Sequence, residues 1–131
     1  MRDVRPDPDK ATALVKMSDK ILERVKETDV DRFPSQVLRD YYDALRQLME
    51  AVACLNGVKS EGLGAHQQLI DWFIDEYNLS ESKRQFLHQI RRHRNRFEYE
   101  GYFVNKEYIE RNRPKINEII TYLKDILDQS L

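Results

Sequence analysis

Residues 34–56 carry the widest apolar face in the chain and therefore constrain its fold most. Apolar side chains recur there at intervals of three and four residues, the pattern of an amphipathic helix. These are Val37, Leu38, Tyr41, Leu45, Leu48, Met49, Val52 and Leu55. Pro34 suits the first turn of such a helix, and Gly57 suits the position just after its last turn. The stretch is predicted to be one of several helices that pack together.

Four further stretches show the same periodicity and predict helices at 10–27, 65–77, about 81–101 and from 105 to the end. Ser80 and Asn105 are suitable N-caps for the last two. Pro114 is expected either to kink the final helix or to separate its first turns from the rest. No segment has the pattern of a strand. The short connections predict an all-α, antiparallel up-and-down bundle of about five helices, one domain over 1–131 with residues 1–9 as a short tail.

Composition narrows the class of protein. Charged residues make up 34% of the chain, and glycine and proline occur four times each, which favours helices with solvated outer faces. No apolar run is long enough to cross a bilayer, and the N-terminus lacks the apolar core of a signal peptide. A single cysteine, Cys54, excludes an internal disulfide and fits a reducing compartment. We therefore expect a cytoplasmic protein with no membrane partner.

Positive charge gathers in one predicted helix. Between Arg84 and Arg96 there are five arginines and two histidines and no acidic residue. The formal net charge of the chain is −1, so the remainder is acidic. This helix is expected to form a local surface that attracts anions.

Helical geometry divides the side chains of this basic stretch between two sides. The side expected to face the core holds Phe86, Ile90, His93 and Phe97. The opposite side holds His88, Arg92, Asn95 and Tyr99. Arg94 projects beside Leu87 and Ile90, so it must either reach an edge or be held by a carboxylate, because an unpaired buried charge costs several kcal/mol, on the order of 3–5.

The stretch from Leu87 to Gly101 resembles the signature helix of HEPN domains, which are small helical bundles. The upstream residues Tyr41 to Arg46 and the loop leading to His66 are similar in order to small members of that family, and the resemblance covers roughly residues 34–127. It implies a homodimer in which two signature helices line a basic cleft. It also implies, for many members, a metal-independent ribonuclease acting as a toxin restrained by a minimal nucleotidyltransferase antitoxin.

The family motif places a histidine a short distance after an arginine and a polar residue. Arg94 and Asn95 match its first half, and Tyr99 stands where the histidine would be. An imidazole titrates near neutral pH, whereas a phenol has a pKa of about 10. The sequence therefore leaves both binding and cleavage open.

Three hypotheses follow. In the first, the chain is a binding module for RNA or nucleotide phosphate and a toxin-type component of a pair with a nucleotidyltransferase. Arg94 would make the specific phosphate contact, and Asn95 and Tyr99 would supply hydrogen bonds; these three are also the candidate catalytic residues. Arg91, Arg92, Arg96 and His88 would attract and bind phosphate along the helix. In the second, the same cleft is a metal-independent endoribonuclease that recruits His88, His93 or Tyr99 as acid or base. In the third, the arginines pair with acidic residues across a dimer interface.

Neither a cofactor nor a metal is predicted. His88 and His93 are five residues apart and point to opposite sides of one helix, so they cannot share an ion. His66 is expected to cap or pack near the start of the third helix, with a role at the cleft as the alternative.

Overall fold

The structure is a computed structural model that describes all 131 residues. Its elements in chain order are β1 (Arg2–Asp3), α1 (Pro8–Glu27), α2 (Pro34–Leu55), β2 (Val58–Lys59), α3 (Ala65–Glu76), α4 (Glu81–Glu100) and α5 (Lys106–Ser130). The predicted all-α bundle of five helices is confirmed. Each helix begins and ends within about two residues of the position that its capping residues indicate.

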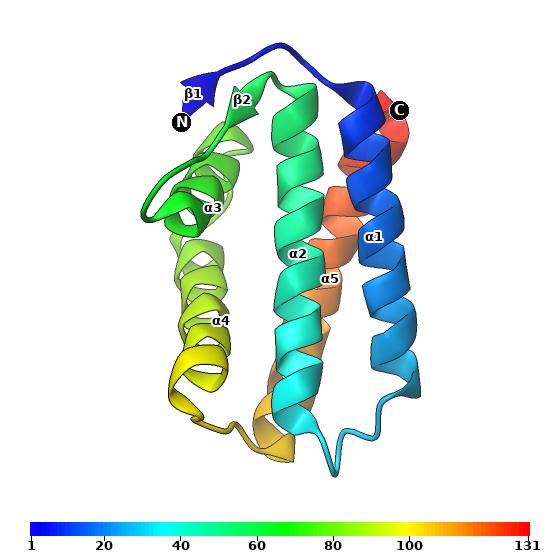
Figure 1. The fold of residues 1–131 in the computed structure, drawn as a ribbon, viewed down its shortest axis with the longest axis vertical. Helices are drawn as coiled ribbons and strands as arrows, with labels where there is room; N and C mark the ends of the chain where they lie inside the picture. Colours follow the sequence, from blue (N-terminus) through cyan, green and yellow to red (C-terminus); the bar gives the residue numbers. More distant parts are fainter.

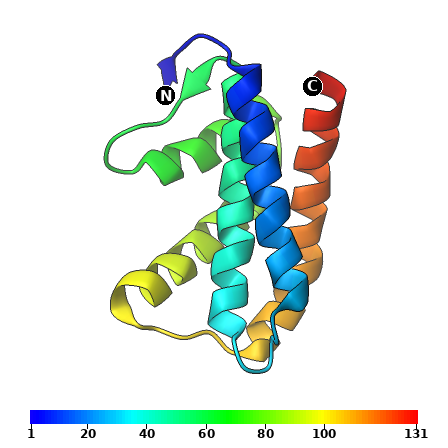
Figure 2. The same ribbon diagram turned by 45° about the vertical axis from the view of Figure 1, so that its right-hand side comes forward.

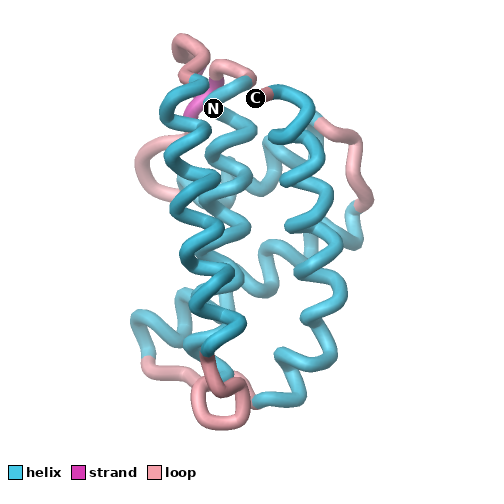
Figure 3. Tube along the Cα trace, turned by 90° about the vertical axis from the view of Figure 1, so that its right-hand side faces the viewer, coloured by secondary structure: helices cyan, strands magenta, loops and turns pink.

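The five helices form two groups. Helices α1, α2 and α5 lie side by side as a bundle of three long helices (Figure 1). Helices α3 and α4 pack against one flank of α2 and diverge from it like the two sides of a V (Figure 2). The N-terminus of α3 and the C-terminus of α4 lie at the open ends of this V. Both chain termini lie at the same end of the bundle (Figure 3).

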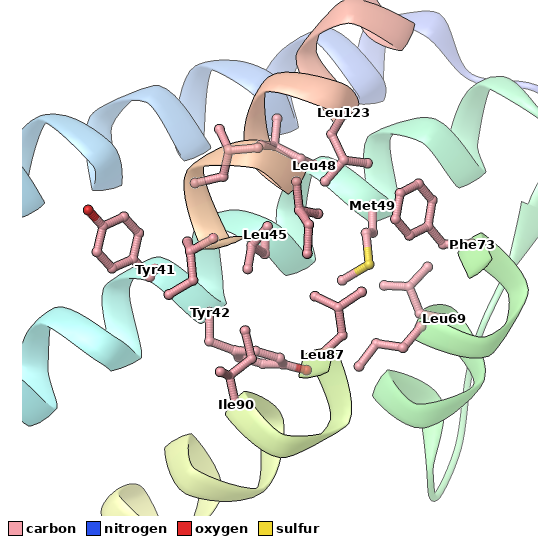
Figure 4. Close-up of a cluster of buried hydrophobic side chains, with 14 of the residues drawn as sticks. Tyr41, Tyr42, Leu45, Leu48, Met49, Leu69, Phe73, Leu87, Ile90 and Leu123 are labelled. Carbon is pink, nitrogen blue, oxygen red and sulfur yellow. The ribbon is translucent and has the colours of Figure 1, made fainter. Parts of the chain in front are cut away.

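Helix α2 lies at the centre of the core, as its broad apolar face requires. Leu45 and Leu48 are fully buried within a single cluster of 28 buried residues. Tyr42 lies between α2 and α4, with its ring beside Leu87 and Ile90 (Figure 4). Each large side chain buried in this way stabilises the fold by about 1.5–3 kcal/mol. The core therefore fixes the position of α4 against α2.

Local signals set the helix ends. The side chains of Ser80 and Asn105 accept hydrogen bonds from the backbone N–H groups of Lys83 and Tyr108, as expected of N-caps. Gly101 ends α4 in the left-handed conformation at φ 67°. Helix α5 is continuous through Pro114, so the alternative in which its first turns are separate is wrong.

The N-terminal residues are not a free tail, and the expectation that no segment forms a strand is wrong. Strands β1 and β2 pair in antiparallel fashion, with Arg2 opposite Lys59. The N–H of Val4 then donates to the carbonyl of Gly57 at 2.8 Å. Gly57 has a φ of +68°, and a Cβ atom at this position would lie 2.9 Å from the carbonyl oxygen of Val4. Strands of two residues carry no periodicity, so the sequence pattern could not reveal them.

An ion pair between a buried carboxylate and a largely exposed arginine joins α1 to α2. Asp40 is almost fully buried, and its two carboxylate oxygens accept hydrogen bonds from Nε and Nη2 of Arg24, both at 2.8 Å. The hydrogen bond to Asp40 raises the pKa of Arg24 above its usual range. Bidentate pairing of this kind fixes the geometry of the two helices as well as their charge balance.

None of the five helices is both long enough and apolar enough to cross a membrane.

Candidate functional site

A groove opens between the N-terminus of α3 and the middle of α4, inside the V seen in Figure 2. Its volume is about 390 Å³. The residues that line it are Gly62, Leu63, Gly64, Ala65, His66, Gln67, Arg91 and Asn95. The β2–α3 loop thus forms one wall, and the basic helix predicted from the sequence forms the other.

The first turn of α3 presents free backbone donors along this groove. Gly64 is the N-cap residue of the helix at φ 75° and provides no side-chain cap. The N–H groups of His66 and Gln67 donate to no acceptor in the protein. Unsatisfied N–H groups at the start of a helix carry partial positive charge and favour an anion.

A second, shallower groove of about 270 Å³ continues along α4 toward its C-terminal end. It is lined by Arg92, Asn95, Arg96, Tyr99 and Glu100. Asn95 lines both grooves and joins them. The Nη1 of Arg94 donates to Oδ1 of Asn95 at 3.3 Å, which leaves the amide N–H groups of Asn95 free to donate. We call the two grooves together the α4 channel.

Three of the five arginines in the basic stretch form ion pairs with carboxylates of the same chain: Arg84, Arg94 and Arg96. Arg84 bonds to Asp71 at 2.9 Å and to Glu81 at 2.8 Å, and it also contacts Asp75. These acceptors raise the pKa of Arg84 above its usual range. Arg84 therefore holds α3 and α4 together rather than facing a ligand.

Arg94 has the carboxylate partner that its position demands. Its Nη2 lies 3.2 Å from Oδ1 of Asp43 on α2, and only 16% of the Arg94 side chain is exposed. The alternative in which a carboxylate holds Arg94 is thereby confirmed. Arg96 lies 3.4 Å from Glu100, one turn further along α4.

Arg91 and Arg92 have no carboxylate partner, so they are the uncompensated cations of the channel. Arg91 is partly buried, and this burial lowers its pKa from the ordinary value, although a guanidinium stays charged at neutral pH. Its Nε donates to Nδ1 of His88 at 3.4 Å. Arg91 is thus held at the channel by His88, and Arg92 is exposed.

The three histidines lie in three different environments. Nε2 of His88 lies 2.9 Å from Asp71, so His88 faces α3 and supports Arg91 instead of lining the channel. The ring of His93 packs edge-on against Tyr108 of α5 at 4.8 Å. His66 lines the groove, and burial lowers its pKa. No three groups of the metal-binding types lie together.

Beneath the groove lies a layer of buried polar atoms without hydrogen-bond partners. Three such side-chain atoms lie where α2 faces α4. They are Tyr42 Oη, Arg46 Nε and Arg94 Nε. Burial raises the pKa of Tyr42 to about 12. Orphaned polar atoms are rare in packed interiors and concentrate at sites of function.

Most of the site residues predicted from the sequence line the α4 channel, but two do not. Arg91, Arg92, Asn95, Arg96 and Tyr99 line the α4 channel, whereas Arg94 and His88 lie behind it as supports.

Sequence reasoning missed the contribution of the β2–α3 loop. The Gly-Leu-Gly stretch at 62–64 resembles no known phosphate-binding motif, and the strand before it is only two residues long. Its approach to α4 depends on tertiary packing, so no local pattern could reveal it. The first turn of α3, which follows the loop, places His66 in the groove, the alternative role considered for that residue.

The fold and site define a class: an all-α bundle with a basic channel along one helix. No family model, curated protein or solved structure matches this chain. The chemistry of the channel itself is therefore the basis for a function.

Proposed function

We propose that the α4 channel binds a phosphate group of RNA or of a nucleotide. One observation carries the proposal: Arg91, a partly buried cation with no carboxylate partner, shares a groove with the Asn95 amide and the free N–H groups of α3. The guanidinium supplies charge and two parallel donors, and the amide and backbone groups complete a set of donors for phosphate oxygens.

The remaining residues act around this centre. Arg92, which has no carboxylate partner, attracts polyanions over a longer range, and Tyr99 and Arg96, the latter paired with Glu100, border the channel. Arg94 acts as a positioning residue, because it holds the Asn95 amide and is itself held by Asp43. His88 positions Arg91 in the same way.

The proposal extends to a HEPN-like protein. The order of the helices and the Arg94–Asn95 pair on α4 support this assignment. The resemblance adds a cytoplasmic homodimer and a toxin-type role beside a minimal nucleotidyltransferase antitoxin. Co-purification of the chain with such a partner, and the mass of the chain alone in solution, test these two additions.

Binding is measured by the fluorescence anisotropy of labelled RNA in EDTA over a range of salt concentrations. We expect Arg91→Ala to weaken binding and to lower the slope of log Kd against log salt by about 0.7, the value for one phosphate contact on a single strand. Lys16→Ala is the matched control, because Lys16 is an exposed, unpaired cation on α1. Lys16→Ala is expected to leave the slope unchanged. Equal effects of the two substitutions would show that binding is non-specific attraction and would contradict the proposal.

A second candidate, a metal-independent endoribonuclease, is favoured by the place of His66. Its burial in the groove lowers its pKa, so its imidazole is neutral at neutral pH and can accept a proton. A 2′-oxygen would attack phosphorus and lose its proton to His66, while the 5′-oxygen leaves and takes a proton from water.

Cleavage of a labelled RNA in EDTA tests this candidate. Loss of cleavage in His66→Gln, with RNA binding retained, is the expected result. Arg94→Ala is expected to weaken both binding and cleavage because it releases Asn95. Wild-type protein that binds RNA without cleaving it would exclude the ribonuclease and leave the binding module.

A further inference from the structure

Exposed aromatic side chains lie on the last turn of α4 and just beyond it, and one of them, Tyr99, lines the α4 channel. Tyr99 is 79% exposed on the last turn of α4, and Phe103 is 69% exposed just beyond it. Tyr102 lies between them in sequence, with the guanidinium carbon of Arg96 3.8 Å from its ring centre. The ring of Phe103 contacts Phe97 edge-on, with the centres 5.6 Å apart, so its position is fixed although its surface is free.

The ring of Tyr99 continues the phosphate-binding line along one face of the helix. Arg91, Asn95 and Tyr99 are spaced by four residues, so they form one stripe on α4. The stripe is about 12 Å long at the helical rise per residue. Successive phosphates of one strand are separated by about 3.4 Å along a duplex axis, so the stripe is longer than a single phosphate requires.

We propose that the α4 channel takes single-stranded RNA, with a phosphate at Arg91 and Asn95 and an unpaired base stacked on Tyr99. This inference rests on the proposed function and specifies its substrate class. A duplex hides the faces of its bases, whereas a single strand offers them to aromatic rings. Arg92, an exposed cation without a carboxylate partner, lines the same groove as Tyr99 and supplies charge that complements a polyanion.

The test compares a short labelled single-stranded RNA with the same strand in a duplex, and with AMP and inorganic phosphate as competitors. We expect Tyr99→Ala to weaken binding of the single strand by about 5- to 140-fold. Phe103→Ala, which removes an exposed ring that lies on Phe97, is expected to have a smaller effect. Tyr99→Phe keeps the ring and is expected to bind like wild type. Met17→Ala removes an exposed apolar side chain from α1 and serves as the control.

The outcomes separate this inference from the proposed function. Absence of binding to every RNA, to AMP and to phosphate would contradict both the proposed function and the stacking inference. Binding that depends on Arg91, survives both aromatic substitutions and is equal for duplex and single strand would overturn only the stacking inference. A shift between monomer and dimer in Tyr99→Ala, with RNA binding unchanged, would assign the rings to a second copy of the chain and also overturn it.

Discussion

On the two sides of helix α2, the best-defined buried polar groups differ in whether they are satisfied. On the side of α1, Asp40 is matched by the two hydrogen bonds of Arg24, and the buried hydroxyl of Ser18 donates to the carbonyl of Val15 at 2.8 Å. On the side of α4, the hydroxyl of Tyr42 and Nε of Arg94 are buried without partners. Both contacts are helix on helix, but Asp40 and Ser18 form their hydrogen bonds, whereas the Tyr42 hydroxyl forms none.

This difference distinguishes the contact with α1 from the contact beneath the candidate site. A satisfied polar pair stabilises one arrangement of two helices, whereas an unsatisfied group destabilises the fold by about 1–3 kcal/mol. The unsatisfied layer lies directly beneath the α4 channel, where His66 and Arg94 approach the ring of Tyr42. Natural proteins depart from full satisfaction chiefly at functional sites. The contrast therefore supports the location of the site without reference to any motif.

The largest expected effect comes from breaking the satisfied side. Arg24→Ala leaves the Asp40 carboxylate buried without its bidentate partner and is expected to lower the free energy of unfolding by about 2–3 kcal/mol. Urea denaturation monitored by circular dichroism measures the change. Lys20→Ala removes an exposed pair with Glu23 and is the control, with an expected change within about 0.5 kcal/mol. Equal losses in the two variants would show that the α1–α2 pair is not a structural clamp.

A smaller effect of opposite sign is expected on the unsatisfied side. Tyr42→Phe removes a hydroxyl with no partner and keeps the ring, so the free energy of unfolding should rise by up to about 1 kcal/mol. Ser18→Ala removes a hydroxyl that does form a bond and should lower it by about 1 kcal/mol. The same urea titration serves both. A loss of stability in Tyr42→Phe would mean that its hydroxyl is satisfied after all, and the contrast between the two sides would fail.

The smallest expected effect is a pH dependence on the side of α4. Burial lowers the pKa of His93, whose Nδ1 has no partner, so its neutral form is the one that folds best. Above about pH 6.5, the pKa of His93 in the unfolded chain, His93 is neutral in both states and does not change the free energy of unfolding. As pH falls below that value, the unfolded chain binds a proton before the folded chain does, so the free energy of unfolding decreases. His93→Phe should reduce this decrease. Denaturation of both proteins between neutral and mildly acidic pH measures the difference, and parallel curves would contradict the assignment.

The sequence predicted what local chemistry determines. Ser80, Asn105 and Gly101 sit at helix ends for reasons confined to a few residues, so the boundaries of α4 and the start of α5 could be predicted. The position of the Arg94 charge beside the core likewise predicted that a carboxylate would pair with it.

The partner is Asp43, and its identity depends on how α2 and α4 pack. The spacing of apolar residues in the sequence does not predict this packing. The same limit applies to the meeting of the β2–α3 loop with Arg91, and to the two-residue strand pair. Sequence patterns therefore indicated which helix carries the site, but not the wall that faces it.

The strand pair has a consequence for the timing of ligand exchange. Arg2 pairs with Lys59 in the sheet and forms an ion pair with Glu61 at 2.9 Å, so the N-terminal residues tether the loop that walls the channel. A chain trimmed of these residues would keep its helices, but the loop would have to become ordered each time a ligand arrives. That ordering costs conformational entropy, about 1–2 kcal/mol per residue fixed. The expected signature is a shorter residence time of the bound molecule, with the melting of the helical bundle little changed.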